Sequence, residues 1–192
     1  MKLFLKGDRC YSAKCAIERR QTPPGMHMTR RKKMEDYGLQ LREKQRLKRL
    51  FGMMEGQFVR FLRRAESQAG NTGENFLRLL ESRLDNVLYR MGFAPSHPAA
   101  RSMIAHGHVR INGKKVRIPS YTVKAGDEIR IATERLKAVV EAAMKSAQNR
   151  GGTASWLSTG PDGMSGTVKN LPNKEDISLP VDEGLVVTYY SR

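Results

Sequence analysis

Arginine side chains recur at helical spacing in two stretches of the sequence. The first stretch holds Arg42, Arg46 and Arg49, and the second holds Arg60, Arg63 and Arg64. At about 100° per residue, the members of each trio fall within one arc of a helix. A guanidinium group binds phosphate oxygens through paired hydrogen bonds and stacks on bases. Acidic partners at i,i+4 are sparse, so both arcs predict contact with phosphate groups, with plain solvation of a charged face as the alternative.

Apolar residues on the opposite arcs predict the helices that position these arginines. They recur at three- and four-residue steps between residues 35 and 68, at Leu47, Leu50, Phe51, Met54, Phe58, Phe61 and Leu62. Such a stripe packs into a core. Gly52 and Gly56 indicate a break or bend that divides the stretch into two helices.

A second helical region follows the loop at residues 70–73. Thr72 is the expected cap of a helix that runs through Met91. The core face of this helix is formed by Phe76, Leu79, Leu80, Leu84, Val87, Leu88 and Met91. Ser96 is the expected cap of a shorter helix through Ala105, and residues 135–148 predict one more helix.

The dipeptide Asn112-Gly113 lies between two runs of alternating apolar and polar residues, which is a strong signal for a β-hairpin with a type I′ turn. The alternation predicts four inward side chains, Val109, Ile111, Val116 and Ile118. Three basic side chains then point outward, Arg110, Lys115 and Arg117. Residues 128–131 predict a third strand, and the tail holds strand candidates at residues 155–157, 166–169 and 185–190.

The net charge of the 192-residue chain is +16. Residues 1–82 carry +10, residues 83–145 carry +7, and residues 146–192 carry −1. This excess predicts a polyanionic partner, because each neutralised phosphate releases counterions and adds affinity. Nucleic acid is the commonest such partner, and an anionic membrane surface is the alternative. No apolar run approaches the ~20 residues of a membrane span, and residues 1–6 do not have the pattern of a secretory signal.

Two cysteines, Cys10 and Cys15, have the spacing of half a four-cysteine zinc site. Two thiols cannot close a tetrahedral site, and His27 could supply only a third ligand. We therefore expect two free reduced thiols, no cofactor, and no zinc in this chain unless an upstream cysteine pair exists. For His106 and His108, beside a predicted helix end and strand start, we expect packing, capping or RNA contact rather than metal binding.

Several motifs together resemble the family of small-subunit ribosomal protein S-four, bacterial type. The paired helices, the Asn-Gly hairpin and the later Ala-Gly-Asp turn resemble the alpha-L RNA-binding module, which many RNA-binding proteins share. Residues 79–93, LLESRLDNVLYRMGF, narrow the resemblance to this family. The resemblance extends along the chain through PPG at 23–25, DYGLQLREKQ at 36–45, NTG at 71–73 and YYSR at 189–192.

The resemblance implies an α+β fold in three parts. Residues 1–82 would form a basic arm and a helical rRNA-binding domain. Residues 83–147 would form the alpha-L module, two helices packed on a small, mostly antiparallel sheet. Residues 148–192 would form a short β-containing C-terminal extension that packs back on the other two.

The resemblance also implies a structural constituent of the small ribosomal subunit, located in the cytoplasmic ribosome, that is not an enzyme. Members of the family bind small-subunit rRNA early at a multi-helix junction and help to nucleate assembly of the subunit body. They contribute to translational accuracy beside neighbouring small-subunit ribosomal proteins. The mRNA near its entry path is a further implied partner, and no membrane is expected.

Basic side chains are the expected rRNA contacts, namely Arg19, Arg20, Arg42, Arg46, Arg49, Arg60, Arg63, Arg64, Arg83, Arg101, Arg110, Lys114 and Lys115. In the family, basic residues after the Pro-Gly turn of the arm lie near incoming mRNA, and the matching positions here are Arg30, Arg31 and Lys33. Met26 and Met28 replace the Gln and Gly that usually flank the arm histidine.

Two other classes of protein carry similar features. A pseudouridine synthase with an alpha-L module uses an Arg-Leu-Asp triplet, present here at residues 83–85. That triplet is predicted to lie in the middle of a helix, and too little chain remains for a catalytic domain. A peripheral membrane protein would pair its basic face with exposed apolar residues, yet Trp156 lies outside the basic segments. No Ser-His-Asp set, carboxylate pair in an apolar pocket or cofactor loop indicates catalysis.

Overall fold

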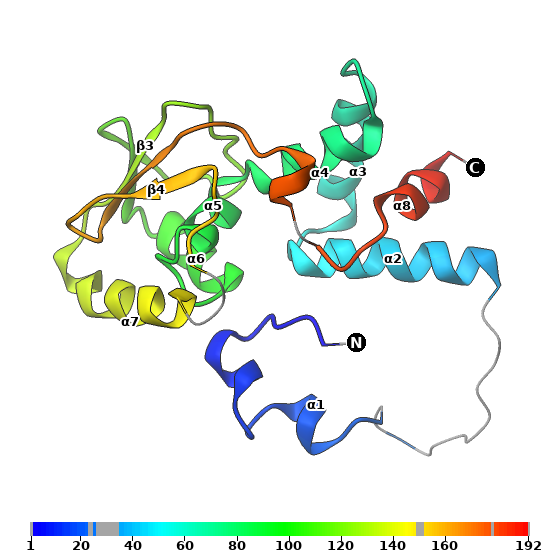
Figure 1. The fold of residues 1–192 in the computed structure, drawn as a ribbon, viewed down its shortest axis with the longest axis horizontal. Coiled ribbons are helices and arrows are strands. Elements are labelled where there is room, and N and C mark those ends of the chain that lie inside the picture. The colour runs from blue at the N-terminus through cyan, green and yellow to red at the C-terminus, as the bar shows by residue number, and fades with distance from the viewer. Residues whose placement is uncertain (1, 23–24, 26–34, 149–151, 178, 192) are drawn as a thin grey trace.

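A computed structural model describes residues 2–22, 25, 35–148, 152–177 and 179–191, and within them the fold is α+β, as predicted (Figure 1). The helices are α1 (Ala16–Arg19), α2 (Asp36–Leu50), α3 (Glu55–Glu66), α4 (Thr72–Glu81), α5 (Leu84–Arg90), α6 (His97–Ala105), α7 (Lys137–Gln148) and α8 (Glu183–Tyr190). The strands are β1 (Val109–Ile111), β2 (Lys114–Val116), β3 (Glu128–Ile131), β4 (Leu157–Thr159) and β5 (Ser165–Val168). Three short 3-10 helices are η1 (Gly7–Tyr11), η2 (Glu134–Leu136) and η3 (Lys174–Asp176).

Helices α2, α3, α4 and α8 enclose one of two apolar cores. Phe58 of α3 meets Phe76 of α4 edge to face, with ring centroids 5.0 Å apart, and both side chains are fully buried. The predicted helical stripe holds at Leu47 and Leu62, but Met54 is 79% exposed. Helix α2 ends at Leu50 and the left-handed backbone of Gly52 (φ +54°) turns the chain, so Met54 leaves the stripe.

The predicted strand at residues 185–190 is wrong, because these residues belong to helix α8. The Asp182 side chain caps this helix by accepting from the backbone N–H groups of Gly184 and Leu185, at 2.9 and 3.3 Å. Val186 is fully buried in the first core, where α8 packs against α2 and α4. The β-branched residues of this segment favour a strand in isolation, but the packing of one helical face outweighs that preference.

The predicted single helix from residue 72 to residue 91 is also wrong, since it is divided between Glu81 and Leu84. At the break, the backbone N–H of Leu84 donates to the Tyr121 carbonyl (2.8 Å), and that of Val123 donates to the Ser82 carbonyl (2.9 Å). A crossing segment of chain therefore takes the hydrogen bonds that a continuous helix would make. Helix α4 is capped by Asn71, not by Thr72. The Asn71 side chain accepts from the backbone N–H groups of Gly73 and Glu74, at 2.8 and 3.3 Å.

The strands form one sheet in the order β2-β1-β3-β5-β4, and every pair within it is antiparallel. Its inner face packs on the second core together with α5, α6 and α7, through Val109, Ile111, Ile129, Ile131, Leu157 and Val168. The inward prediction fails for Ile118, which is 60% exposed because β2 ends two residues earlier, at Val116. The predicted strands at 155–157 and 166–169 correspond to β4 and β5, displaced by one or two residues.

The β4–β5 hairpin brings the tail into the sheet by pairing β5 with β3. Gly166 permits this approach: a Cβ atom there would lie 2.7 Å from the Ser158 carbonyl oxygen and 3.0 Å from the Met91 sulfur. Residues 157–168 thus complete the sheet unit, whereas α8 completes the helical unit (Figure 1).

Candidate nucleic-acid interface

The arginine trios lie on the solvent side of α2 and α3. Helix α3 buries Phe58, Leu62 and Ala65, which leaves its arginines on the opposite face. The exposed members of the two trios are Arg42, Arg49, Arg60, Arg63 and Arg64. Among the residues that the structure describes, no carboxylate lies within ion-pair distance of these five. We refer to these five side chains, two on α2 and three on α3, together as the first basic surface; each is exposed and can meet an external anion.

Arg46 differs from its neighbours because its charge is already partnered. It is half-buried, forms an ion pair with Glu43 one turn earlier, and donates to the Pro180 carbonyl at 3.4 Å. Glu43 also accepts from the backbone N–H of Asp182 at 3.4 Å. Arg46 therefore helps to hold the segment before α8 against α2.

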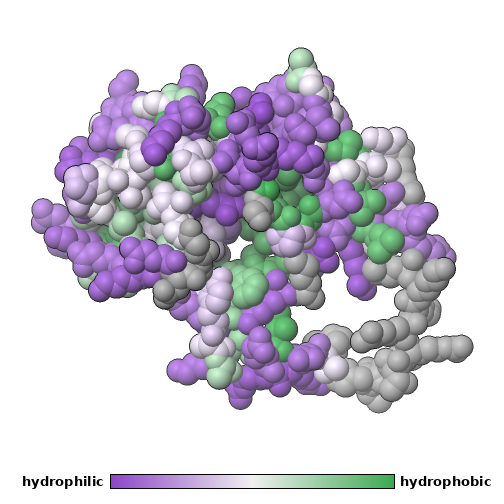
Figure 2. Space-filling view, viewed as in Figure 1, coloured by the Kyte–Doolittle hydropathy of each residue, from purple (hydrophilic) through white to green (hydrophobic). Residues whose placement is uncertain are grey.

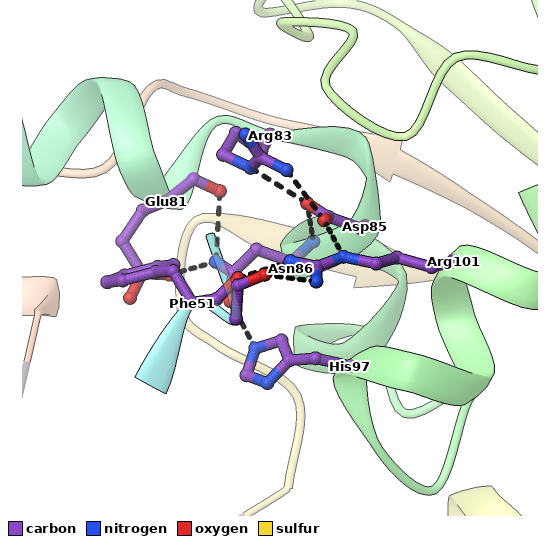
Figure 3. Close-up of polar contacts among 8 residues, drawn as sticks. Phe51, Glu81, Arg83, Asp85, Asn86, His97 and Arg101 are labelled. Atoms are coloured by element: carbon purple, nitrogen blue, oxygen red, sulfur yellow. Dashed lines mark hydrogen bonds and ion pairs between the residues drawn. The ribbon is translucent and has the colours of Figure 1, made fainter. Parts of the chain in front are cut away.

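Arg83 lies in the interior, with only 2% of its surface exposed. Its Nε and Nη2 atoms donate to the two carboxylate oxygens of Asp85 at 3.0 and 2.8 Å, as Figure 3 shows. Its guanidinium also lies 5.4 Å from the centroid of the Phe61 ring. This placement does not suit the phosphate contact expected of Arg83, and it assigns the side chain to the internal framework.

Arg101 closes the same network from helix α6. Its Nε donates to Asp85 at 2.7 Å (Figure 3). Its two terminal nitrogens donate to the carbonyls of Phe51 and Gly52. The Arg-Leu-Asp triplet thus lies at the start of α5 rather than in mid-helix, and its aspartate is engaged by two arginines. A carboxylate held in two ion pairs is suited to fixing structure, not to attacking a base.

A second buried polar group connects α4, α5 and α6. Asn86 donates to Glu81 and accepts from His97, with 2.8 Å between the His97 Nε2 and the Asn86 Oδ1 atoms (Figure 3). Arg90 pairs with the same Glu81 at 2.6 Å. Burial lowers the pKa of His97 to about 4, since it penalises the imidazolium form. His97 is therefore neutral, and it is part of the frame rather than of a surface.

The predicted hairpin carries the second basic surface. Asn112 and Gly113 take positive φ angles of 49° and 77°, as a type I′ turn requires. The Asn112 side chain ties the turn to β3 by donating to Asp127 and accepting from the Glu128 N–H, both at 2.9 Å. We call the exposed basic side chains of the hairpin the second basic surface. Arg110 and Lys115 lie opposite each other on the outer face of the sheet, and Lys114 lies opposite Ile111 at the turn.

Sequence reasoning missed basic residues beside this hairpin. Arg130 lies directly opposite Arg110 in the antiparallel register of β1 and β3, and both are exposed on the outer face of the sheet. Lys137, at the start of α7, is exposed as well. The alternation at residues 128–131 was a signal that Arg130 points outward, but the register that brings it to Arg110 is a tertiary property.

The arm is described only in part. Arg19 and Arg20 are exposed, while the expected mRNA-side residues Arg30, Arg31 and Lys33 lie outside the described residues. Cys10 and Cys15 are buried free thiols. A hydrogen bond from the Glu18 backbone lowers the pKa of Cys15 more than desolvation raises it. In the described ranges, no group of three His, Cys, Asp or Glu residues is arranged to hold a metal ion.

Hydrophilic residues cover most of the face seen in Figure 2, and apolar residues appear between the two units and near the arm. None of the described helices is long and apolar enough to cross a membrane.

Comparison with known proteins shows similarity to ribosomal proteins along the whole chain. Residues 1–81 match the family described as ribosomal protein S4/S9 N-terminal domain, and residues 82–129 match the S4 domain family. The small ribosomal subunit protein uS4A of Alkaliphilus oremlandii is 51% identical over 192 residues, which cover 100% of this chain and 92% of that protein. The uS4 proteins of Thermodesulfovibrio yellowstonii and Trichlorobacter lovleyi are 49% and 51% identical, with the same coverage of both chains.

Proposed function

Because this chain belongs to the uS4 family of small ribosomal subunit proteins, we propose that it binds small-subunit rRNA through the two basic surfaces defined above. The protein is a structural component of the small subunit and not an enzyme. The observation that carries the proposal is that the exposed arginines of α2 and α3, and the basic residues of the β1–β2 hairpin, form no ion pair within the residues that the structure describes. RNA phosphates supply the missing charge.

The arrangement of the two surfaces suits folded RNA. They belong to separate units, one helical and one built on the sheet, which the Arg101 contacts to Phe51 and Gly52 hold together. A rigid pair of basic surfaces can contact two RNA helices at a junction and restrict their relative orientation. On this basis we infer the role in early assembly of the subunit body, and in translational accuracy, that the family resemblance implies.

The boundaries of the parts remain as proposed from the sequence, with an arm and helical domain at 1–82, an alpha-L module at 83–147 and an extension at 148–192. The β5–β3 pairing and the packing of α8 on α2 support an extension that contacts both other parts. Arg19 and Arg20 are proposed rRNA contacts of the arm. Arg30, Arg31 and Lys33 are proposed to face incoming mRNA, and neighbouring small-subunit proteins are proposed partners.

Filter binding to a small-subunit rRNA transcript over a range of salt concentrations tests the proposed surfaces. Arg63→Ala on α3 and Lys115→Ala on β2 should each weaken binding and reduce the slope of log K against log salt by about 0.7–0.9, one lost phosphate contact. Lys145→Ala is the matched control, because Lys145 is an exposed cation of α7 outside both surfaces. Slopes that match the control for both variants would contradict the proposed surfaces, and failure of the native protein to bind would contradict rRNA binding itself.

A further inference from the structure

A groove of about 680 Å³ lies where the outer face of the sheet meets the C-terminal extension. The residues that line it include three cations, Arg110, Arg130 and Lys137, and two carboxylates, Glu134 and Asp162. The S4 domain match ends at residue 129, so Arg110 is the one of these five side chains that lies within the matched module. The extension contributes Asp162 and Met164 to the groove, and the other lining residues precede residue 148. The groove adjoins the second basic surface, with which it shares Arg110.

The register of the sheet concentrates positive charge at this groove. Arg110 lies between Lys115 of β2 and Arg130 of β3, opposite both, so three cations form one row across three strands. Neighbouring strands are only about 4.8 Å apart, and like charges directly opposite each other destabilise a sheet. In the described part of the chain, none of these three cations has an ion-pair partner. The carboxylates of Glu134 and Asp162 line the same groove but form no ion pair with the row, so its repulsion is only partly offset.

Hydrogen bonds hold the Asp162 carboxylate in place at the groove. Asp162 accepts from the Ser165 hydroxyl at 2.6 Å, and from the backbone N–H groups of Met164 and Ser165 at 3.2 and 3.1 Å. These hydrogen bonds lower the pKa of Asp162, with a further contribution from the charge of Arg130. Ser165 lies opposite Arg130 in the β3–β5 register, so the row of cations continues into hydroxyl and carboxylate groups.

We propose that this groove binds the sugar-phosphate backbone of an RNA strand, with Arg110, Arg130 and Lys137 on phosphates and Asp162 accepting from a ribose hydroxyl. The inference rests on the proposed function, since it extends the same RNA contact. RNA is the partner the geometry favours, because the row is continuous with the hairpin cation Lys115. A row of cations beside a fixed acceptor matches the alternation of phosphate and 2′-hydroxyl along an RNA strand.

The first test is the double variant Arg130→Gln and Lys137→Gln, which removes two groove cations that the proposed function does not use. The slope of log K against log salt for the rRNA transcript should fall by about 1.4–1.8, for two lost phosphate contacts. Lys145→Gln, on the same helix as Lys137, is the control and should leave the slope unchanged. Arg130→Gln should also leave the thermal unfolding midpoint equal or higher, because it relieves repulsion at Arg110. A lower midpoint together with an unchanged slope would make Arg130 a structural residue and overturn the proposal.

The second test locates the RNA. Ala132 is exposed and lines the groove, so Ala132→p-benzoylphenylalanine places a photocrosslinker inside it, while Val139→p-benzoylphenylalanine places one on an exposed part of α7 outside it. In assembled small subunits, crosslinks to rRNA from position 132 and not from position 139 support the proposal. Crosslinks from 132 to another protein would overturn it. If the double variant binds with the native slope while Arg63→Ala does not, the groove proposal fails and the proposed function stands.

Discussion

Asp85 and Arg101 are joined by a 2.7 Å contact between the carboxylate and Nε, across the interface of α5 and α6. The same guanidinium donates to the carbonyls of Phe51 and Gly52, which follow α2. Because Asp85 also holds the buried Arg83, one carboxylate organises contacts within the sheet unit and between the two units. The relative position of the two basic surfaces therefore depends on a buried side chain that belongs to neither surface.

Removing the Asp85 carboxylate should strongly destabilise the protein. Asp85→Ala leaves the guanidinium of Arg83 buried without its anion, and breaking a buried pair in this way costs about 3–5 kcal/mol. Chemical denaturation, read as the free energy of unfolding, measures the effect. Glu141→Gln, an exposed carboxylate of α7, is the control and should change stability by less than about 0.5 kcal/mol. A cost for Asp85→Ala as small as that of the control would contradict the internal role assigned to Arg83.

His97 should make stability depend on pH in the mildly acidic range. Its folded pKa of about 4 lies below its ordinary value of 6.5, so between these values the unfolded chain binds a proton that the folded protein does not. Stability contributed by neutral His97 is thus complete above pH 6.5 and falls by about 1.4 kcal/mol per pH unit as the pH drops toward 4. Urea unfolding of the native protein and of His97→Gln across this range measures the difference. If the free energy of unfolding changes with pH in the same way for the two proteins, the lowered pKa of His97 is contradicted.

Glu55 should contribute in a lower range of pH. Desolvation raises its pKa, but hydrogen bonds from Lys44, Lys48 and Tyr190 outweigh this and lower the pKa from 4.5 to about 2. A depressed carboxyl pKa stabilises the fold above pH 4.5, and this contribution is lost as the pH falls through the window from 4.5 to 2. The free energy of unfolding of Glu55→Gln should therefore change less with pH in that window than that of the native protein. Equal slopes would argue that the Tyr190 and lysine contacts do not persist in solution.

Two glycines should respond to alanine in opposite directions. Gly166→Ala places a Cβ against the Ser158 carbonyl and the Met91 sulfur, and such overpacking costs about 1–3 kcal/mol. Gly56→Ala adds a Cβ in open space on helix α3 and should stabilise the protein by about 0.4–1 kcal/mol. Thermal unfolding of both variants measures the contrast. A neutral result for Gly166→Ala would mean that β5 can move away from α5 without loss.

Several features that depend on local sequence signals were predicted correctly, although the cap of α4 is Asn71 and not the predicted Thr72. The Asn112-Gly113 turn, the Ser96 cap of α6 and the division between α2 and α3 each follow from a few neighbouring residues. The break before Leu84 could not be predicted in this way, because its cause is a carbonyl of Tyr121, far along the chain. Helix α8 was missed for a similar reason, since its preference over a strand comes from packing on α2 and α4.

The candidate site was harder to predict than the fold. In the sequence, Arg83 and Arg63 are equally basic residues near helical segments, yet one is buried against Asp85 and the other is exposed. Arg130 was overlooked because only the strand register places it beside Arg110. The net charge of each segment shows which parts of the sequence are basic, and tertiary contacts decide which of their cations are exposed without an ion-pair partner.

The order β2-β1-β3-β5-β4 bears on how a newly made chain matures. While the polypeptide is being synthesised, one edge of β3 stays open until residues 165–168 emerge, and the apolar faces of α2 and α4 stay uncovered until residues 183–190 follow. An open strand edge and an exposed apolar face both promote aggregation and proteolysis. A chain that lacks these two segments therefore exposes both an unpaired strand edge and an apolar helical face.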